Sequence, residues 1–167
     1  MAATTQLQQG TALTWAASGG DYTITMTSVT STNGRQGVKG DLGANWARTY
    51  SVLFTSSVGS AATNGTVIEL YAGRSNSATA GTNNPGGLSG TDATFNTTPA
   101  EYKLQLDYIG SLVLSNNAGT GIQKQWFTFY PRSRYIIPVI VNSSGQTLGS
   151  TAGDHTIVFL PINDYTA

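Results

Sequence analysis

Alternation of apolar and polar residues with a period of two most constrains how this chain can fold. The clearest examples are residues 22–27 (YTITMT) and 102–107 (YKLQLD). This alternation is the pattern of a β-strand with one buried face. An amphipathic helix needs apolar residues that recur every three or four positions, and Gly, Pro or clusters of Ser, Thr and Asn interrupt every such stretch of 11 residues. The best candidate for a helical segment is a short turn at residues 42–48. The periodicity therefore predicts an all-β protein.

Glycine-rich turns separate the predicted strands and set their number. Asn-Gly pairs at 33–34 and 64–65 suit the positive φ angles of tight turns. Further β-like runs cover residues 49–58, 66–71, 109–114 and 125–130. Eight or nine short strands predict a single-domain β-sandwich or barrel over residues 11–167. Residues 1–10 are polar, uncharged and rich in Gln, and we expect them to form a flexible or partner-held N-terminal arm.

Two late runs, residues 134–141 and 155–162, are almost continuously apolar. Such runs are typical of strands that are covered on both faces. Each contains a proline, Pro138 or Pro161, which cannot donate a hydrogen bond to a neighbouring strand. Two explanations stay open: an edge strand that a neighbouring subunit covers, or a bulge within one chain.

Residues 73–100 form the longest stretch without a strand pattern, and only Arg74 and Asp92 are charged within it. A connection of this length is unusual inside a compact domain. It is either a mobile surface loop or an ordered arm that lies on a partner. We favour the arm, with Leu88 and Phe95 as its apolar anchors.

Low charge limits the classes of function. Charged residues make up 10% of the chain, against about 25% in an ordinary soluble domain, and the formal net charge is zero. The scattered basic residues give nucleic-acid binding no electrostatic support. No apolar run has the length of a membrane span, and no secretory signal is recognisable at the start. Weak repulsion between copies favours an assembly in the cytoplasm.

Catalytic chemistry has little support. The only histidine, His155, follows Asp154 directly, and neighbouring residues of a strand point to opposite faces. A Ser-His-Asp triad is therefore not expected. Scattered acids such as Glu69 and Asp107 leave a hydrolase as a weak third option. Without cysteine there is no disulfide or thiolate site, and we expect no enzyme activity, no metal and no cofactor.

Three tryptophans separate into core and surface candidates. Trp15 and Trp126 lie in predicted strands, and we expect both to fill the core. Trp46, between Asn45 and Arg48, is the better candidate for an exposed ring that stacks on a sugar.

Four stretches, residues 71–93, 108–119, 131–148 and 154–164, resemble small structural proteins of tailed bacteriophages. The shared features are a strand that ends in Tyr-Ala-Gly, a long Asn/Gly/Ser loop and apolar strands close to the C-terminus. The resemblance implies a capsid decoration (cement) protein, a class of jelly-roll proteins that are commonly trimers on the capsid shell. It carries over no chemical residues.

The first hypothesis is therefore a non-enzymatic virion protein that binds the outer surface of the phage head as a homotrimer. It would contact the major capsid protein or another virion protein, with no nucleic acid and no membrane. The alternative is a carbohydrate-binding module of a phage tail or receptor-binding protein. The predicted partner-binding residues are Trp46, Arg74, Leu88, Phe95, Arg132 and Arg134.

Overall fold

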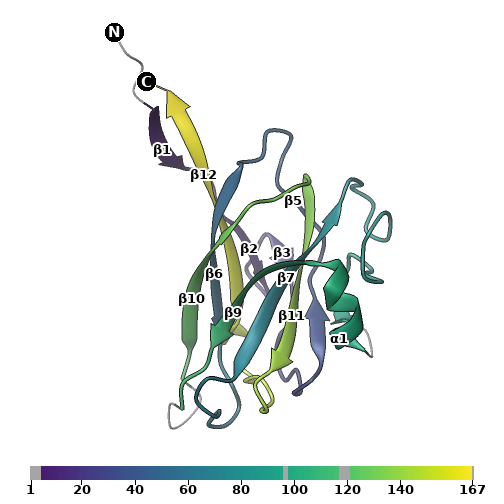
Figure 1. Ribbon diagram of the computed structural model, residues 1–167, viewed down its shortest axis with the longest axis vertical. Helices are drawn as coiled ribbons and strands as arrows, with labels where there is room; N and C mark the ends of the chain where they lie inside the picture. The colour runs from purple at the N-terminus through teal and green to yellow at the C-terminus, as the bar shows by residue number, and fades with distance from the viewer. Residues whose placement is uncertain (1–4, 96–97, 117–120, 167) are drawn as a thin grey trace.

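The computed structural model describes residues 5–95, 98–116 and 121–166, which form two β-sheets packed face to face (Figure 1). This arrangement confirms the predicted all-β sandwich. The described residues contain twelve strands, more than the eight or nine predicted, because several strands are only two or three residues long. Residues 42–48, the candidate for a short helical turn, contain a turn at residues 44–45 and no helix.

We name the two six-stranded sheets A and B. Sheet A has the order β10-β6-β12-β2-β3, with β1 paired to β12. Its strands are β1 (Thr5–Gln9), β2 (Leu13–Ala16), β3 (Tyr22–Thr23), β6 (Thr49–Ser56), β10 (Gln123–Phe129) and β12 (Thr156–Thr166). All of its pairs are antiparallel except β2 with β3.

Sheet B has the order β8-β4-β11-β7-β9, with β5 paired to β11. Its strands are β4 (Gly34–Gln36), β5 (Gly40–Asp41), β7 (Val67–Ser75), β8 (Ala93–Phe95), β9 (Asp107–Val113) and β11 (Tyr135–Ser143). The short helices are α1 (Pro99–Tyr102), η1 (Lys103–Gln105) and η2 (Ala152–Asp154). Every pair in sheet B is antiparallel.

The main core lies between the sheets and is rich in aromatic rings. Trp15 is fully buried, stacks on Tyr22 at 4.8 Å between ring centroids and donates its indole N–H to the Val38 carbonyl at 2.8 Å. The prediction for Trp15 is therefore confirmed. The same prediction was wrong for Trp126, which is 58% exposed, because the alternation of β10 turns Phe127 and Phe129 inward instead.

A second, smaller core lies on the outer face of sheet B. Residues 76–95 and 98–106, which we call the covering segment, supply its lid, and α1 lies beside the sheet in Figure 1. The lid packs on alternate residues of β11; the buried members of this cluster are Tyr71, Leu88, Phe95, Ile137, Val139 and Val141. β11 is thus covered on both faces, as predicted for residues 134–141, and the cover belongs to the same chain.

This packing corrects the interpretation of residues 73–100. Strand β7 continues to Ser75 and β8 begins at Ala93, so the irregular connection is shorter than predicted. Leu88 and Phe95 are 4% and 0% exposed. They anchor the segment to its own sheet and are not available to a partner. Leu88 fits tightly: a Cβ at Gly73 would lie 2.2 Å from its Cδ1 atom.

The buried ammonium of Lys39 fixes the beginning of the covering segment. Its Nζ donates to the Ser75 hydroxyl and to the carbonyls of Ser77, Thr79 and Thr82 at 2.7–3.0 Å. Burial lowers the pKa of Lys39 from its usual value. One ammonium, with three N–H donors, therefore joins the end of β7 to three carbonyls of residues 76–92, which form no strand.

Both prolines occupy breaks in the neighbouring pairing. Residues 37–39, between β4 and β5, face only residues 137–138 of β11, and Gly37 N–H donates to the Pro138 carbonyl at 2.9 Å. Residues 10–12, between β1 and β2, face residues 160–161 of β12 in the same way, and Gly10 donates to Pro161 at 3.0 Å. Because β11 and β12 are interior strands, the bulge explanation is correct and the edge-strand explanation was wrong.

The N-terminal segment is more ordered than a free arm. Residues 5–9 form β1, which pairs in register with residues 162–166 of β12. This two-stranded ribbon extends beyond the sandwich in Figure 1. Residues 1–4 of the predicted arm lie outside the described residues.

Candidate binding surface

Exposed large apolar side chains gather in one part of the sequence. Seven such residues occur among the described residues, and six of them lie between positions 104 and 130. They come from η1, β9, β10 and the residues that flank them: Leu104, Tyr108, Val113, Ile122, Trp126 and Tyr130. We call this region the β9–β10 side: Trp126 belongs to the outer face of sheet A and Tyr108 to that of sheet B, on the two edge strands that meet here. The seventh residue, Trp46, is 37% exposed in the β5–β6 connection.

The two edge strands β9 and β10 lie against each other and close this side of the sandwich. The Gln125 side-chain oxygen accepts a hydrogen bond from Val113 N–H at 3.2 Å, and Gln123 does the same for Ser115 at 2.9 Å. Phe127 packs so closely on Gly110 that a Cβ there would lie 2.2 Å from the ring. These inward contacts fix the register that leaves Trp126 facing outward.

Two hollows meet at Arg132, beside the beginning of β9 and the end of β10. The smaller, of about 200 Å³, is lined by Asp107, Tyr108, Thr128, Phe129, Tyr130 and Arg132. The larger, of about 480 Å³, is lined by Arg74, Ser75, Asn76, Asn83, Arg132 and Ser133. The structure therefore brings together two of the predicted partner-binding residues, Arg74 and Arg132.

An ion pair joins the two hollows. Arg74 Nε lies 2.9 Å from Asp107 Oδ2, although the contact is not directed as a hydrogen bond and this buried oxygen has no other partner. Arg132 is exposed and forms no ion pair within the described part of the chain. With two guanidinium groups and one carboxylate, the region carries a local positive charge.

Arg134 is paired with Asp41, away from the hollows around Arg132. Its Nε and Nη2 donate to the two carboxylate oxygens of Asp41, each at 2.7 Å, and its guanidinium lies 5.1 Å from the Tyr135 ring centroid. The hydrogen bonds from Arg134 lower the pKa of Asp41 and raise the pKa of Arg134. This bidentate pair ties β5 to the beginning of β11. Neither Arg134 nor Trp46 lines the hollows around Arg132.

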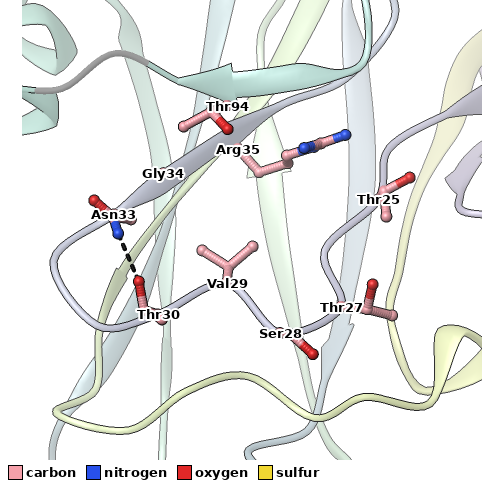
Figure 2. A pocket seen from close by; sticks show the side chains of 9 residues that line it. All are labelled: Thr25, Thr27, Ser28, Val29, Thr30, Asn33, Gly34, Arg35 and Thr94. Carbon is pink, nitrogen blue, oxygen red and sulfur yellow. Dashed lines mark hydrogen bonds between the residues drawn. The ribbon is translucent and has the colours of Figure 1, made fainter.

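A third hollow, of about 220 Å³, lies beside β4 and is lined largely by hydroxyl groups (Figure 2). Its charged and amide groups are already paired: Arg35 donates to Asp92 at 2.7 Å and Asn33 to Thr30 at 2.5 Å. Burial alone would raise the pKa of Asp92, but hydrogen bonds from Arg35 and Thr25 outweigh it and hold this pKa below the usual value. Its single cation is therefore balanced by Asp92, and unlike the hollows around Arg132 it has no unpaired arginine in its lining.

The lone histidine takes part in a buried hydrogen-bond chain that the sequence did not predict. His155 Nε2 lies 2.9 Å from the Gly149 carbonyl, which can only accept, so Nε2 carries the proton. Nδ1 then accepts from the Ser56 hydroxyl at 2.9 Å. Burial lowers the pKa of His155. Both side chains are at most 1% exposed, so the pair joins β6 to the start of β12 and is closed to a substrate.

The described residues contain no group of three His, Cys, Asp or Glu side chains placed to hold a metal ion. Within the same residues, no helix has the length and apolar character needed to cross a membrane. No family model matches the sequence, and no curated protein matches it. What the surface binds is therefore inferred from its chemistry.

Tyr108, Tyr130 and Asp107 were missed as site residues by sequence reasoning. The sequence held one signal for them, which is that Tyr130 precedes Arg132 by two residues in a Tyr-Pro-Arg turn after an aromatic strand. Nothing local connects that turn to residues 74 and 107. The pairing of β7 with both β11 and β9 brings these three segments together.

Proposed function

We propose that this chain is a non-enzymatic structural protein of a tailed-phage virion that decorates and stabilises the outer surface of the head. The single observation that carries the proposal is the concentration of exposed apolar side chains on the β9–β10 side. Such a concentration marks an interaction surface, and Trp, Tyr and Arg are the residue types enriched at binding hot spots. The resemblance to phage structural proteins supplies the kind of assembly.

Low charge supports the same proposal. Eight basic and eight acidic residues leave the chain without net charge, so packing many copies on one shell costs little electrostatic repulsion. A decoration protein acts by mass action, because a molecule that binds only the assembled shell stabilises that shell. Association as a homotrimer would pool several weak contacts with the major capsid protein and raise the avidity.

Co-sedimentation with purified empty capsids tests this proposal. We expect the unaltered chain to bind, and the variant Trp126→Ser to lose at least about 2 kcal/mol of binding free energy, as for a hot-spot aromatic residue. Arg48→Ser is the matched control, because Arg48 is exposed and lies outside this sequence region. An unaltered chain that stays monomeric by native mass spectrometry and does not bind capsids would contradict the proposal.

A carbohydrate-binding module of a phage tail or receptor-binding protein is the second candidate. The observation that favours it is the exposed indole of Trp46, which leaves an aromatic face for a sugar ring. A glycan array distinguishes the two functions. Binding to a glycan that Trp46→Ala abolishes, together with no capsid binding, would replace the first candidate by the second.

A further inference from the structure

The hollows around Arg132 contain several hydrogen-bond donors that are not used within the described residues. Arg132 has no ion-pair partner among the described residues, and Arg74 uses Nε toward Asp107, which leaves its Nη groups. The Asn76 side-chain oxygen accepts from Asn83 Nδ2 at 2.8 Å, so the Asn76 amide N–H groups remain. A ligand that satisfies these donors must be rich in acceptor oxygens.

The charge of the larger hollow favours an anion. Two guanidinium groups and no carboxylate line it, while the neighbouring smaller hollow contributes only Asp107, which already pairs with Arg74. This is a local excess of positive charge in a chain whose formal net charge is zero. The planar guanidinium of Arg132 can bind both oxygens of a carboxylate at once.

Aromatic rings and size indicate the rest of the ligand. Tyr108 and Tyr130 line the smaller hollow and are 57% and 64% exposed, so each presents ring surface to the apolar face of a sugar. The larger hollow, about 480 Å³, has the size of a small-ligand site and exceeds the volume of one acidic side chain. We infer that the hollows around Arg132 bind an acidic saccharide, that is, a sugar ring bearing a carboxylate.

The site is held in shape before a ligand arrives. Lys39 fixes Ser75 and the following carbonyls, and the Asn76–Asn83 hydrogen bond closes the same connection. Ser133 donates to the Tyr135 carbonyl at 2.9 Å and so orients the turn that carries Arg132. A preorganised site loses little conformational entropy on binding, which favours the weakly held ligands that saccharides usually are.

Titration calorimetry on the full chain tests the inference with 3′-sialyllactose and a glucuronic acid disaccharide, and with neutral lactose as the comparison. We expect at least one acidic saccharide to bind and lactose to bind about tenfold more weakly or not at all, as for the loss of a charged hydrogen bond. Arg132→Gln should weaken the acidic ligand by a similar factor. Arg48→Gln, a matched change outside both hollows, should leave binding unchanged.

Three results would overturn the inference: no binding of either acidic saccharide, equal binding of lactose, or unchanged affinity in Arg132→Gln. A Glu-rich peptide that binds while the saccharides do not would also overturn it, in favour of a protein carboxylate. The inference does not rest on the capsid proposal. Capsid binding is tested through Trp126, which lines neither hollow, and saccharide binding through Arg132, so the two failures are distinguishable.

Discussion

The outer face of sheet B is covered and that of sheet A is open, although β11 and β12 are both almost continuously apolar. In β11, every residue from Ile136 to Asn142 is buried, because the covering segment packs on the outer face of sheet B. In β12, Ile157 and Phe159 face the core, whereas Val158 and Leu160 between them stay partly exposed. The expectation that both late strands are covered on both faces is therefore confirmed for β11, whereas the described residues of the chain supply no such cover for the outer face of β12.

The uncovered face of sheet A carries an apolar row. The register aligns Trp126 with Leu53, Leu53 with Val158 and Val158 with Thr14, so these side chains lie side by side across four strands. The difference between the faces shows that a continuous apolar run in a strand indicates that something covers both faces but does not indicate which segment or molecule does so. For sheet B the cover is a distant segment of the same chain. For sheet A the apolar row remains available to a partner.

The largest expected difference in stability between the two faces comes from removing an apolar anchor of the covering segment. We expect Phe95→Ala to lower the free energy of unfolding by about 3–5 kcal/mol, because Phe95 is fully buried and a cavity remains in its place. Trp126→Ala is the matched control on sheet A. It should change stability by no more than about 0.5 kcal/mol, since the ring is largely exposed.

Urea unfolding monitored by circular dichroism measures both variants. Equal destabilisation by Phe95→Ala and Trp126→Ala would contradict the assignment of one face as covered and the other as open. Dye binding gives a second readout, because a released segment would expose the apolar side chains of β11 and increase the fluorescence of a hydrophobic probe.

Local sequence patterns predicted the strands better than the faces that those strands present. Period-two alternation identified the sandwich and placed Trp15 inside. It failed for Trp126 because residues 125–130 (QWFTFY) carry aromatics on both faces. Which face turns inward depends on the register with β6 and on the contact of Phe127 with Gly110, and both are long-range features.

The candidate site was predictable only in part, for the same reason. Arg74 and Arg132 could be named as exposed cations, but their meeting depends on the pairing of Ser75 with Tyr135. Leu88 and Phe95 were assigned to a partner because a sequence does not distinguish an anchor on the chain's own sheet from an anchor on a foreign one. Asp107 comes to the site on β9, because β7 pairs with β11 along one edge and with β9 along the other.

The second way to test the comparison is to leave the apolar anchors intact and remove the cation under the covering segment. We expect Lys39→Met to lower the free energy of unfolding by about 1–3 kcal/mol, because the Ser75 hydroxyl and three partly buried carbonyls lose a charged donor. The rate of amide hydrogen exchange should increase over residues 76–92 and stay close to that of the unaltered chain in sheet A. Lys124→Met, at an exposed position of β10, is the control and should have little effect.

Uniform acceleration of exchange across both sheets in Lys39→Met would contradict a locally held cover. No acceleration at all would mean that the apolar anchors suffice and that the ammonium adds nothing. The proportion between the Phe95 and Lys39 effects thus measures how the cover divides its stability between apolar contacts and hydrogen bonds.

The smallest expected effect is a dependence of stability on pH, which should differ between His155 at the start of β12 and the covering segment on sheet B. Burial lowers the pKa of His155 below its usual 6.5, while the hydrogen bond to the Gly149 carbonyl and the negative charge of Asp154 act in the opposite direction. The unfolded chain therefore binds this proton at a higher pH than the folded chain. Stability is fully present above pH 6.5 and falls below it, by at most about 1.4 kcal/mol per pH unit. Below the pKa of the folded state the loss levels off.

The covering segment should stay closed over that range of pH. It is tied down by Asp92, whose pKa lies below its usual 3.8, so its own loss of stability begins only in stronger acid. Chemical denaturation at pH 7 and pH 5.5 measures the first effect, and His155→Gln should remove the difference because His155 is the only histidine. Hydrogen exchange at pH 5.5 should still protect residues 76–92. A stability that is constant or rises between pH 7 and 5.5 would contradict the buried neutral histidine, and early loss of protection in the covering segment would contradict its independence from sheet A.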